Sequence, residues 1–433
     1  MLKDGLVFPD GFLWGCAVSA HQVEGGNTNN NWWQWEQQGK ILDGSKSGMA
    51  CDHYNRYEED FDIAASLKLN VFRTSIEWSR IEPKQGTINM KEVEHYRNVI
   101  LALRRRGIKP MITLHHFTNP IWFDEQGGWL NPKSPEIFES FVRKVVEHLG
   151  DLIPFYNTIN EPMIVATMSY LFGVFPPGER SLEKCLVAAR NLALAHGRAY
   201  VTIHETCKEL GYPKPQVAPV KQIPHFEPRD PSSTDDVEEA RRRDWFFNGC
   251  FLEAVDTGVL QPPLGNGEKI DHLESSWDFI GVNYYSRTLC TPQGEVFPLP
   301  FTGVPEGVEI SDYGWEVYPD GLREVLLSLK KYGKPVVVTE NGIATRNDEQ
   351  RCRYIVRHLR AVHEAISREV DVKGYIYWSL MDNFEWVLGY QMKFGLVEVD
   401  FETMERRLRS SASLYREIIE ANALLPIHLE RYG

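Results

Sequence analysis

The sequence predicts an α/β protein, an eight-stranded (β/α)8 TIM barrel, and three observations lead to this prediction. Short apolar runs rich in β-branched residues recur along the 433 residues. Longer segments with helical periodicity lie between most of these runs, so strands and helices alternate. Some runs, such as Val336-Val337-Val338, lack polar alternation, which is typical of parallel strands covered on both faces. Because eight βα units close a barrel, we expect residues 1–433 to form a single domain.

The predicted elements follow one another along the whole chain. Strands are expected at residues 12–18, 71–75, 111–114, 155–159, 216–220, 279–282, 336–339 and 375–378. Helices are expected at residues 93–106, 135–149, 182–209 and 349–366, and a final helix with an extension within residues 406–433. Two long loops, at residues 24–52 and 290–315, are expected to help build a substrate pocket.

Composition and charge exclude several partner classes. Hydrophobic residues make up 42% of the chain and charged residues 25%, which is the balance of a globular protein with a large core. The formal net charge of −13 disfavours binding to nucleic acid or to an anionic membrane surface. The short basic runs 104–106 and 241–243 lie in helical segments with acidic neighbours, which favours solvated helix faces. We therefore expect a small-molecule partner.

Cysteine usage and the absence of targeting segments predict a cytoplasmic protein. The seven cysteines are scattered and form no CxxC pair, so we expect reduced thiols. Residues 1–5 lack the pattern of a signal peptide, and no apolar stretch reaches the ~20 residues of a membrane span. The sequence does not determine the oligomeric state.

Chemically active side chains gather where the predicted strands end. The carboxyl ends of barrel strands form the active-site face, so these side chains are expected to meet. Only the fifth strand lacks such residues in this interpretation. Carboxylates and amides bind hydroxyls, and aromatic rings stack on sugar faces, so the set predicts a carbohydrate site. It consists of His21, Gln22, Arg73, His115, His116, Asn160, Glu161, Asn283, Tyr284, Tyr285, Glu340, Trp378, Glu385 and Trp386.

Glu161 and Glu340 occupy matched positions directly after apolar runs and are predicted to be a catalytic pair. In a retaining glycosidase one carboxylic acid protonates the leaving oxygen while a carboxylate attacks the anomeric carbon. Arg73 and Tyr285 are expected to keep Glu340 ionised, which makes Glu340 the nucleophile. The negative charge of Glu340 would then keep Glu161 protonated as the acid/base.

Each of these residues also has a plainer structural interpretation. Arg73 could pair with the nearby Glu77, and His116 could be a hydrogen-bonded core residue. Metal binding is disfavoured for His115-His116, because adjacent strand residues point to opposite faces and no further ligand lies at a suitable spacing. We expect neither a metal nor another cofactor.

Several motifs make the chain resemble glycoside hydrolase family 1, the β-glucosidase and β-galactosidase family, over residues 8–416. The order and strand-end placement of the motifs matter more than any one of them. The ending Phe394-Gly395-Leu396-Val397-Glu398-Val399-Asp400 is most similar to the archaeal and thermophilic branch. The main motifs are Phe72-Arg73-Thr74-Ser75-Ile76-Glu77-Trp78-Ser79-Arg80, Asn160-Glu161-Pro162, Gly281-Val282-Asn283-Tyr284-Tyr285, Thr339-Glu340-Asn341-Gly342 and Trp378-Ser379-Leu380-Met381-Asp382-Asn383-Phe384-Glu385-Trp386.

The resemblance implies a β/α barrel that hydrolyses β-glycosides with retention, with Glu340 as nucleophile and Glu161 as acid/base. It also implies roles for the surrounding residues. Trp378 would form a stacking floor for the sugar, and Trp315 a platform for the leaving group, although an ordinary packed tryptophan is the alternative for Trp315. Hydrogen bonds to the sugar hydroxyls are implied for Gln22, His116, Asn160, Glu385 and Trp386, and Asn283 is expected beside them.

Three alternative functions stay open. A 6-phospho-β-glycosidase would need cationic or hydroxyl groups near O6 of the sugar, where this chain offers Glu385. A non-catalytic sugar-binding relative would be expected to lack one of the two glutamates, yet both are present. Net transglycosylation would use the same intermediate as hydrolysis. The expected substrates are β-glucosides or short β-linked oligosaccharides.

Overall fold

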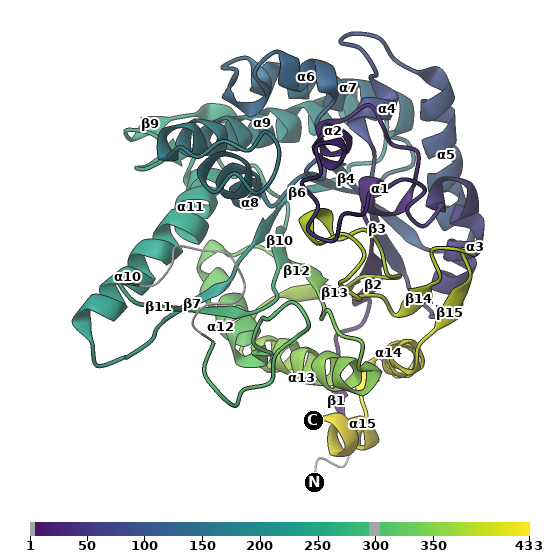
Figure 1. The fold of residues 1–433 in the computed structure, drawn as a ribbon, viewed down its shortest axis with the longest axis vertical. Coiled ribbons are helices and arrows are strands. Elements are labelled where there is room, and N and C mark those ends of the chain that lie inside the picture. Colours follow the sequence, from purple (N-terminus) through teal and green to yellow (C-terminus); the bar gives the residue numbers. More distant parts are fainter. Residues whose placement is uncertain (1–4, 294–303) are drawn as a thin grey trace.

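The computed structural model describes residues 5–293 and 304–433. Its centre is a closed barrel of eight parallel strands in the order β10-β12-β13-β2-β3-β4-β5-β6, and β10 pairs with β6 to close the ring (Figure 1). The fold class predicted from the sequence is therefore confirmed. The barrel strands are β2 (Leu13–Ala17), β3 (Val71–Ser75), β4 (Lys109–His115), β5 (Phe155–Asn160), β6 (Gln216–Gln222), β10 (Ile280–Asn283), β12 (Val336–Asn341) and β13 (Val372–Trp378).

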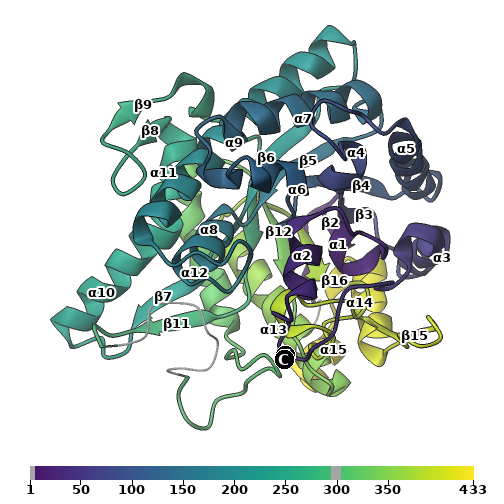
Figure 2. The same cartoon turned by 45° about the horizontal axis from the view of Figure 1, so that its top comes forward.

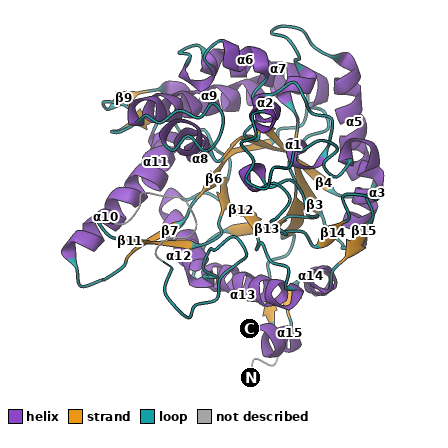
Figure 3. Cartoon of the chain, viewed as in Figure 1, coloured by secondary structure: helices purple, strands orange, loops and turns teal. Residues whose placement is uncertain are grey.

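Helices surround the barrel on its outer side (Figure 3). The four helices predicted from periodicity are all present, and each buries one face. They are α5 (Met90–Arg105), α7 (Ser134–Leu149), α9 (Leu182–Glu209) and α13 (Asp348–Ser367). Other helices of this layer are α3 (His53–Ser66), α11 (Cys250–Thr257), α12 (Pro319–Leu329) and α14 (Ser410–Ala421), and α15 (Pro426–Tyr432) ends the tail as predicted.

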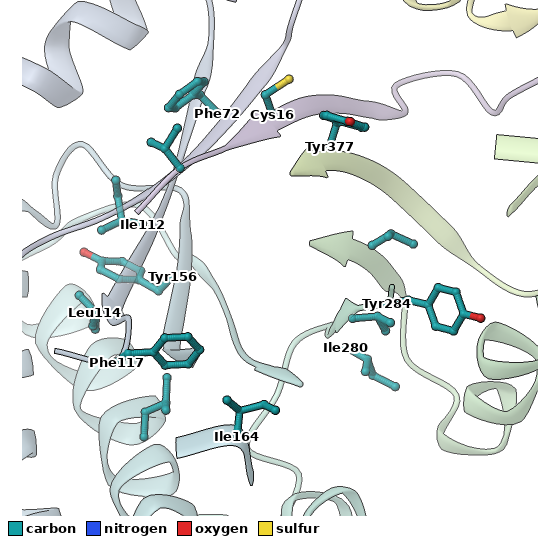
Figure 4. Packing of buried hydrophobic residues seen from close by; sticks show 14 of the residues in the cluster. Cys16, Phe72, Ile112, Leu114, Phe117, Tyr156, Ile164, Ile280, Tyr284 and Tyr377 are labelled. Carbon is teal, nitrogen blue, oxygen red and sulfur yellow. The ribbon is translucent and has the colours of Figure 1, made fainter. Parts of the chain in front are cut away.

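Two apolar layers result from the alternation of side chains along each strand. Val71 and Met111 point into the barrel interior, where they join Leu13, Ala218, Val337 and Ile376. Their chain neighbours Phe72 and Ile112 point outward and pack beneath the helices (Figure 4). Because both faces of every strand are buried, the strands read as continuous apolar runs in the sequence.

Shorter elements lie outside the barrel strands. The strand β1 (Leu6–Val7) pairs with β16 (Ala423–Leu424), which brings the two ends of the chain together (Figure 1). The ribbon of β7 (His225–Pro228) and β11 (Arg287–Cys290) lies beside α10 (Thr234–Asp244) at one edge of the molecule (Figure 2). Of the predicted loop 290–315, residues 294–303 lie outside the described residues. The predicted loop 24–52 contains α2 (Asn31–Gln37).

Several expectations about the whole chain can be compared with the structure. All seven cysteines are free and buried. No helix within the described ranges is long and apolar enough to cross a membrane. In the same part of the chain no group of three potential ligand side chains is arranged around a metal position.

Candidate active site

A pocket of about 1070 Å³ opens at the carboxyl ends of the barrel strands, and both predicted catalytic glutamates line it. Glu161 directly follows β5, and Glu340 lies near the end of β12. Glu161 is 7% exposed and Glu340 is 4% exposed, so each carboxyl group is held largely away from bulk water. The fold thus brings two residues from distant parts of the sequence to one cavity.

Glu340 is held by a cation and a hydroxyl group. Arg73, which is 1% exposed, forms an ion pair with Oε1 of Glu340. The hydroxyl of Tyr285 donates a hydrogen bond of 2.5 Å to Oε2. Arg73 also donates to Oδ1 of Asn160 at 2.7 Å and to Oδ1 of Asn157 at 3.1 Å. Both carboxylate oxygens of Glu340 therefore accept from fixed donors, Oε1 from Arg73 and Oε2 from Tyr285.

The alternative pairing of Arg73 with Glu77 is not found. Glu77 instead accepts hydrogen bonds from the hydroxyls of Ser79, at 2.8 Å, and Thr118, at 2.9 Å. The guanidinium of Arg73 points to the carboxyl ends of β5 and β12, which places its charge at the pocket.

Glu161 has a different environment. Its Oε1 accepts a hydrogen bond of 2.8 Å from the amide of Asn283, and no described cation forms an ion pair with it. The pKa of Glu161 is raised well above its ordinary value. Burial is the largest cause, and the negative charge of Glu340 is the second. Its backbone has a φ of 49°, in the left-handed region, and its N–H donates to the carbonyl of Val220 at 2.7 Å. The pairing with β6 thus fixes a strained backbone that directs the carboxyl group into the pocket.

The residues predicted to bind sugar hydroxyls gather on one side of the pocket. The Nε2 amide of Gln22 lies 3.3 Å from Glu385 and also donates to the carbonyl of Phe384, at 2.8 Å. His116 lies 3.2 Å from the amide of Asn160, and its ring stacks near those of Trp378 and Trp386. Glu385 is a second carboxyl group whose pKa is raised to about 8, first by burial and then by the charges of Glu340 and Glu161. Polar groups and aromatic faces therefore converge as a sugar site requires.

The predicted residues do not all reach the cavity surface. Arg73, Gln22 and Asn283 lie behind the residues that line the pocket and act on them through hydrogen bonds. The other predicted catalytic and binding residues line it directly, namely His116, Asn160, Glu161, Tyr285, Trp315, Glu340, Trp378, Glu385 and Trp386.

Trp315 lines the pocket and is half-buried, so it is neither a core nor a free surface tryptophan. Its ring stacks on Tyr313 with the centroids 3.8 Å apart, and Tyr285 lies 5.2 Å away. Both stacked rings line the same pocket as Glu161 and Glu340.

Comparison with known proteins agrees with this geometry. The model of the family described as Glycosyl hydrolase family 1 matches residues 5–424. The chain belongs to this family. A β-galactosidase of Pyrococcus woesei is 33% identical over 96% of this chain and 98% of its own length, and β-glucosidase A of Thermotoga maritima is also 33% identical over the same shares.

Solved structures of family 1 match almost the entire chain. A β-glycosidase from Pyrococcus horikoshii superposes with a TM-score of 0.90 at 40% identity, covering 99% of this chain and 98% of its own. A family 1 β-glucosidase from Thermotoga maritima in complex with isofagomine lactam has a TM-score of 0.90 at 31% identity, covering 97% and 100%. The predicted resemblance is thus confirmed at the level of family and fold.

Steric crowding explains why the family 1 motif Glu340-Asn341-Gly342 ends in glycine. A Cβ atom at Gly342 would lie 1.8 Å from the carbonyl oxygen of Trp378, so only glycine allows β12 and β13 to approach at this point. The glycine therefore lets the chain after Glu340 pass close to Trp378, and both residues line the pocket.

Sequence analysis missed several residues of this family 1 site. The fifth strand was expected to end without functional residues; β6 ends in Lys221 and Gln222, and Gln222 lines the pocket. The polar pair after the apolar run Val217 to Val220 was a usable signal. Tyr313 was also missed, because it lies in a loop where no periodicity indicates its neighbours.

Proposed function

We propose that this chain is a retaining β-glycosidase that removes terminal, non-reducing β-D-glucosyl residues, and β-D-galactosyl and β-D-fucosyl residues as well. One observation supports this most strongly: the pocket holds one glutamate fixed by Arg73 and Tyr285, and a second that meets only the neutral amide of Asn283. This chemistry requires one carboxylate held in place as a nucleophile and a second carboxyl group whose pKa is raised, as burial and the charge of Glu340 raise that of Glu161. Relatives named β-galactosidase and β-glucosidase support both sugar configurations.

The first step forms a covalent glycosyl-enzyme. Glu340 attacks the anomeric carbon, the bond to the leaving oxygen breaks, and Glu161 gives its proton to that oxygen. Formation of the ester removes the charge of Glu340, so the pKa of Glu161 falls. In the second step Glu161 takes a proton from water, the water oxygen attacks the anomeric carbon, and Glu340 is released.

The surrounding residues would hold the sugar and its leaving group. In this proposal Gln22, His116, Asn160, Glu385 and Trp386 organise the hydroxyls, Trp378 forms the floor, and Trp315 supports the leaving group. We also propose that residues 1–433 form one barrel domain, and the single closed ring of strands from β2 to β13 supports this. The seven free thiols suit a reducing compartment, so we place the enzyme in the cytoplasm.

A panel of 4-nitrophenyl β-glycosides tests the function directly, and its decisive comparison is glucoside against glucoside 6-phosphate. At pH 9, where Glu385 is mostly ionised, we expect the glucoside to have a kcat/KM at least about 10-fold higher, because a phosphate about 4 Å from an ionised carboxylate is repelled and Glu385 must first take up a proton. Since the pKa of Glu385 is about 8, the preference should grow between pH 6 and pH 9. Faster cleavage of the phosphate would contradict the proposal and favour a 6-phospho-β-glycosidase.

The pH profile provides a second test. We expect kcat/KM for 4-nitrophenyl β-glucoside to fall as the pH rises through about 8, since burial and Glu340 raise the pKa of Glu161 to about 8 and only its protonated form can donate. Glu385 titrates in the same alkaline range, so Glu161→Gln decides the assignment. An unchanged alkaline limb of kcat/KM for 4-nitrophenyl β-glucoside in this variant would rule out Glu161 as the acid.

Product analysis separates hydrolysis from net transglycosylation. Both use the same intermediate, and they differ in whether water or a sugar hydroxyl attacks it. Chromatography of the products at high substrate concentration would show free glucose for hydrolysis and longer glucosides for transfer.

A further inference from the structure

Three consecutive residues after β10 connect the proposed nucleophile to a second wall of the pocket. The hydroxyl of Tyr285 donates to Glu340, and the hydroxyl of Ser286 donates a hydrogen bond of 2.8 Å to the backbone carbonyl of Glu316. Arg287 is the first residue of β11, in the ribbon at the edge of the molecule (Figure 2), and it lines the pocket together with Glu316. One short segment of chain therefore contacts both sides of the site.

The guanidinium of Arg287 binds the carboxylate of Glu316 in bidentate geometry. Its Nε donates to Oε2 at 2.8 Å, and its Nη2 donates to Oε1 at 3.0 Å. Glu316 is only 6% exposed, so its carboxylate needs this cation in place of the water that burial removes. Bidentate pairing fixes the orientation of the two side chains as well as the distance between them.

The opposite side of the guanidinium is held by the ribbon. Nη1 of Arg287 donates to Oε2 of Glu227 on β7 at 2.7 Å, and the guanidinium carbon lies 3.9 Å from the ring centre of Tyr318. Oε1 of Glu227 accepts from the Tyr318 hydroxyl at 3.1 Å and lies 2.8 Å from Nε2 of His225. Arg287 is thus anchored to β7 by contacts that do not involve Glu316.

Trp315 directly precedes Glu316 in the second strand of a short hairpin. Ile310 and Glu316 form an antiparallel bridge. The N–H of Ser311 donates to the carbonyl of Trp315 at 2.9 Å, and the N–H of Trp315 donates to the Ser311 hydroxyl at 3.2 Å. The first strand is held from the other side, where Glu309 pairs with two arginines of α13 at 3.0 Å each. The strand that carries Trp315 therefore depends on the contacts made by Glu316.

We propose that Arg287 is a positioning residue for the leaving-group side of the site: by binding Glu316 it fixes the ring of Trp315 against which an aromatic leaving group packs. This inference rests on the proposed function, in which Trp315 supports the leaving group. The carboxylates of Glu316 and Glu227 already pair with the guanidinium, so its charge is not needed by the reacting atoms. The effect of Arg287 should therefore depend on whether the substrate carries a group that reaches Trp315.

The leaving group is bound during the first chemical step and has departed before the second, which makes this role measurable. For an aryl β-glucoside kcat/KM reports the first step, in which stacking on an aromatic ring contributes up to about 10-fold. β-D-Glucosyl fluoride undergoes the same step, but its leaving fluoride is too small to stack on a ring. For 2,4-dinitrophenyl β-glucoside, whose good leaving group makes the second step limiting, kcat reports a step without any leaving group.

The test replaces Arg287 with methionine, which keeps an unbranched chain without charge or donors. We expect kcat/KM for 4-nitrophenyl β-glucoside to fall about 5–10-fold. The value for β-D-glucosyl fluoride, and kcat on the dinitrophenyl substrate, should stay within about 2-fold, because Tyr285 still holds Glu340. Rates are referred to active sites titrated with a 2-deoxy-2-fluoroglucoside. Equal losses on all three substrates would show a general disturbance of the site and overturn the inference.

Glu316→Gln tests whether Arg287 acts through Glu316. The amide keeps the size of the carboxylate but places a donor opposite the guanidinium, so the same loss should appear on the aryl glucoside alone. The double variant should lose no more than the larger single loss, because both changes break one contact. Losses that multiply would show that the two side chains act separately and would overturn the inference. If Arg287→Met fails to fold, Glu316→Gln decides, and an unchanged ratio of aryl glucoside to fluoride overturns it.

Glu227→Gln is the matched control, because Glu227 binds the opposite side of the guanidinium and does not line the pocket. The carbonyl oxygen of the new amide can still accept from Nη1 of Arg287, so the ratio of kcat/KM for aryl glucoside to fluoride should stay within about 2-fold. A loss as large as that of Glu316→Gln would show that the ribbon as a whole, and not the contact with Glu316, controls the site.

Trp315→Ala separates failure of this inference from failure of the proposed function. It removes the ring itself, so kcat/KM should fall about 10-fold for the aryl glucoside and stay in place for the fluoride. If neither value changes, the proposed support of the leaving group fails, and the role of Arg287 fails with it. If Trp315→Ala lowers the aryl value and Arg287→Met does not, only this inference fails. A wild-type enzyme that cleaves neither substrate would contradict the proposed function itself.

Discussion

Replacing Glu340 with alanine is expected to lower kcat on 4-nitrophenyl β-glucoside by about 10⁵-fold, because no carboxylate remains to attack the anomeric carbon. Sodium azide should restore part of the activity. The small anion fits the space beside Arg73 and Tyr285, whose donors would otherwise meet Glu340. It attacks from the side that Glu340 occupied, so the product should be the α-glycosyl azide, with inverted configuration. Steady-state rates and NMR spectra of the product measure both effects.

Glu340→Gln is the matched control, because its amide fills the space and leaves no room for azide. Both variants leave the buried guanidinium of Arg73 without its carboxylate, and breaking a buried ion pair costs about 3–5 kcal/mol of stability. Thermal unfolding must therefore be measured alongside activity. A β-glycosyl azide from Glu340→Ala, or more than about 1% residual activity, would refute the nucleophile assignment.

The barrel and the pocket at the carboxyl ends of its strands were predictable, because strands buried on both faces appear in the sequence as continuous apolar runs. The run Val336-Val337-Val338 shows no polar alternation, and the carboxylate of Glu340 follows where the strand reaches the pocket. The first residue of a helix was harder to predict, because it depends on the capping residue as well as on apolar periodicity. Apolar periodicity placed a start at residue 93, whereas α5 begins at Met90, because the side chain of Asn89 caps a first turn with little apolar signal.

The contacts between distant side chains were harder to predict. Sequence alone could not decide whether Arg73 pairs with nearby Glu77 or with distant Glu340, since only the closed barrel brings the second partner within reach. For the same reason Lys221 was missed. Its position in the sequence predicts an ordinary strand end, whereas the structure buries it to 1% exposure against Asn248 and Phe247. Such pairings depend on register and burial, which no local pattern encodes.

Replacing Glu161 with alanine is expected to have an effect that depends on the leaving group. For phenyl β-glucoside, a poor leaving group, kcat/KM should fall about 10³–10⁴-fold, because no acid remains to protonate the departing oxygen. For 2,4-dinitrophenyl β-glucoside the first step needs no acid, and the loss of kcat/KM should stay below about 10-fold. A series of aryl β-glucosides with graded leaving-group pKa values measures this difference as a steeper slope in the variant than in the wild-type enzyme.

The second step gives an independent check on the same variant. Without Glu161 the attack of water is unassisted, whereas azide needs no base and should raise kcat on the dinitrophenyl substrate. Azide enters from the side of Glu161, so the product should be the β-glycosyl azide, opposite to that expected from Glu340→Ala. The amide of Asn283, which donates to Glu161, is left facing the space and can hold the anion. Equal losses on good and poor leaving groups, or the same azide anomer from both variants, would show that the two glutamates do not have the separate roles proposed for them.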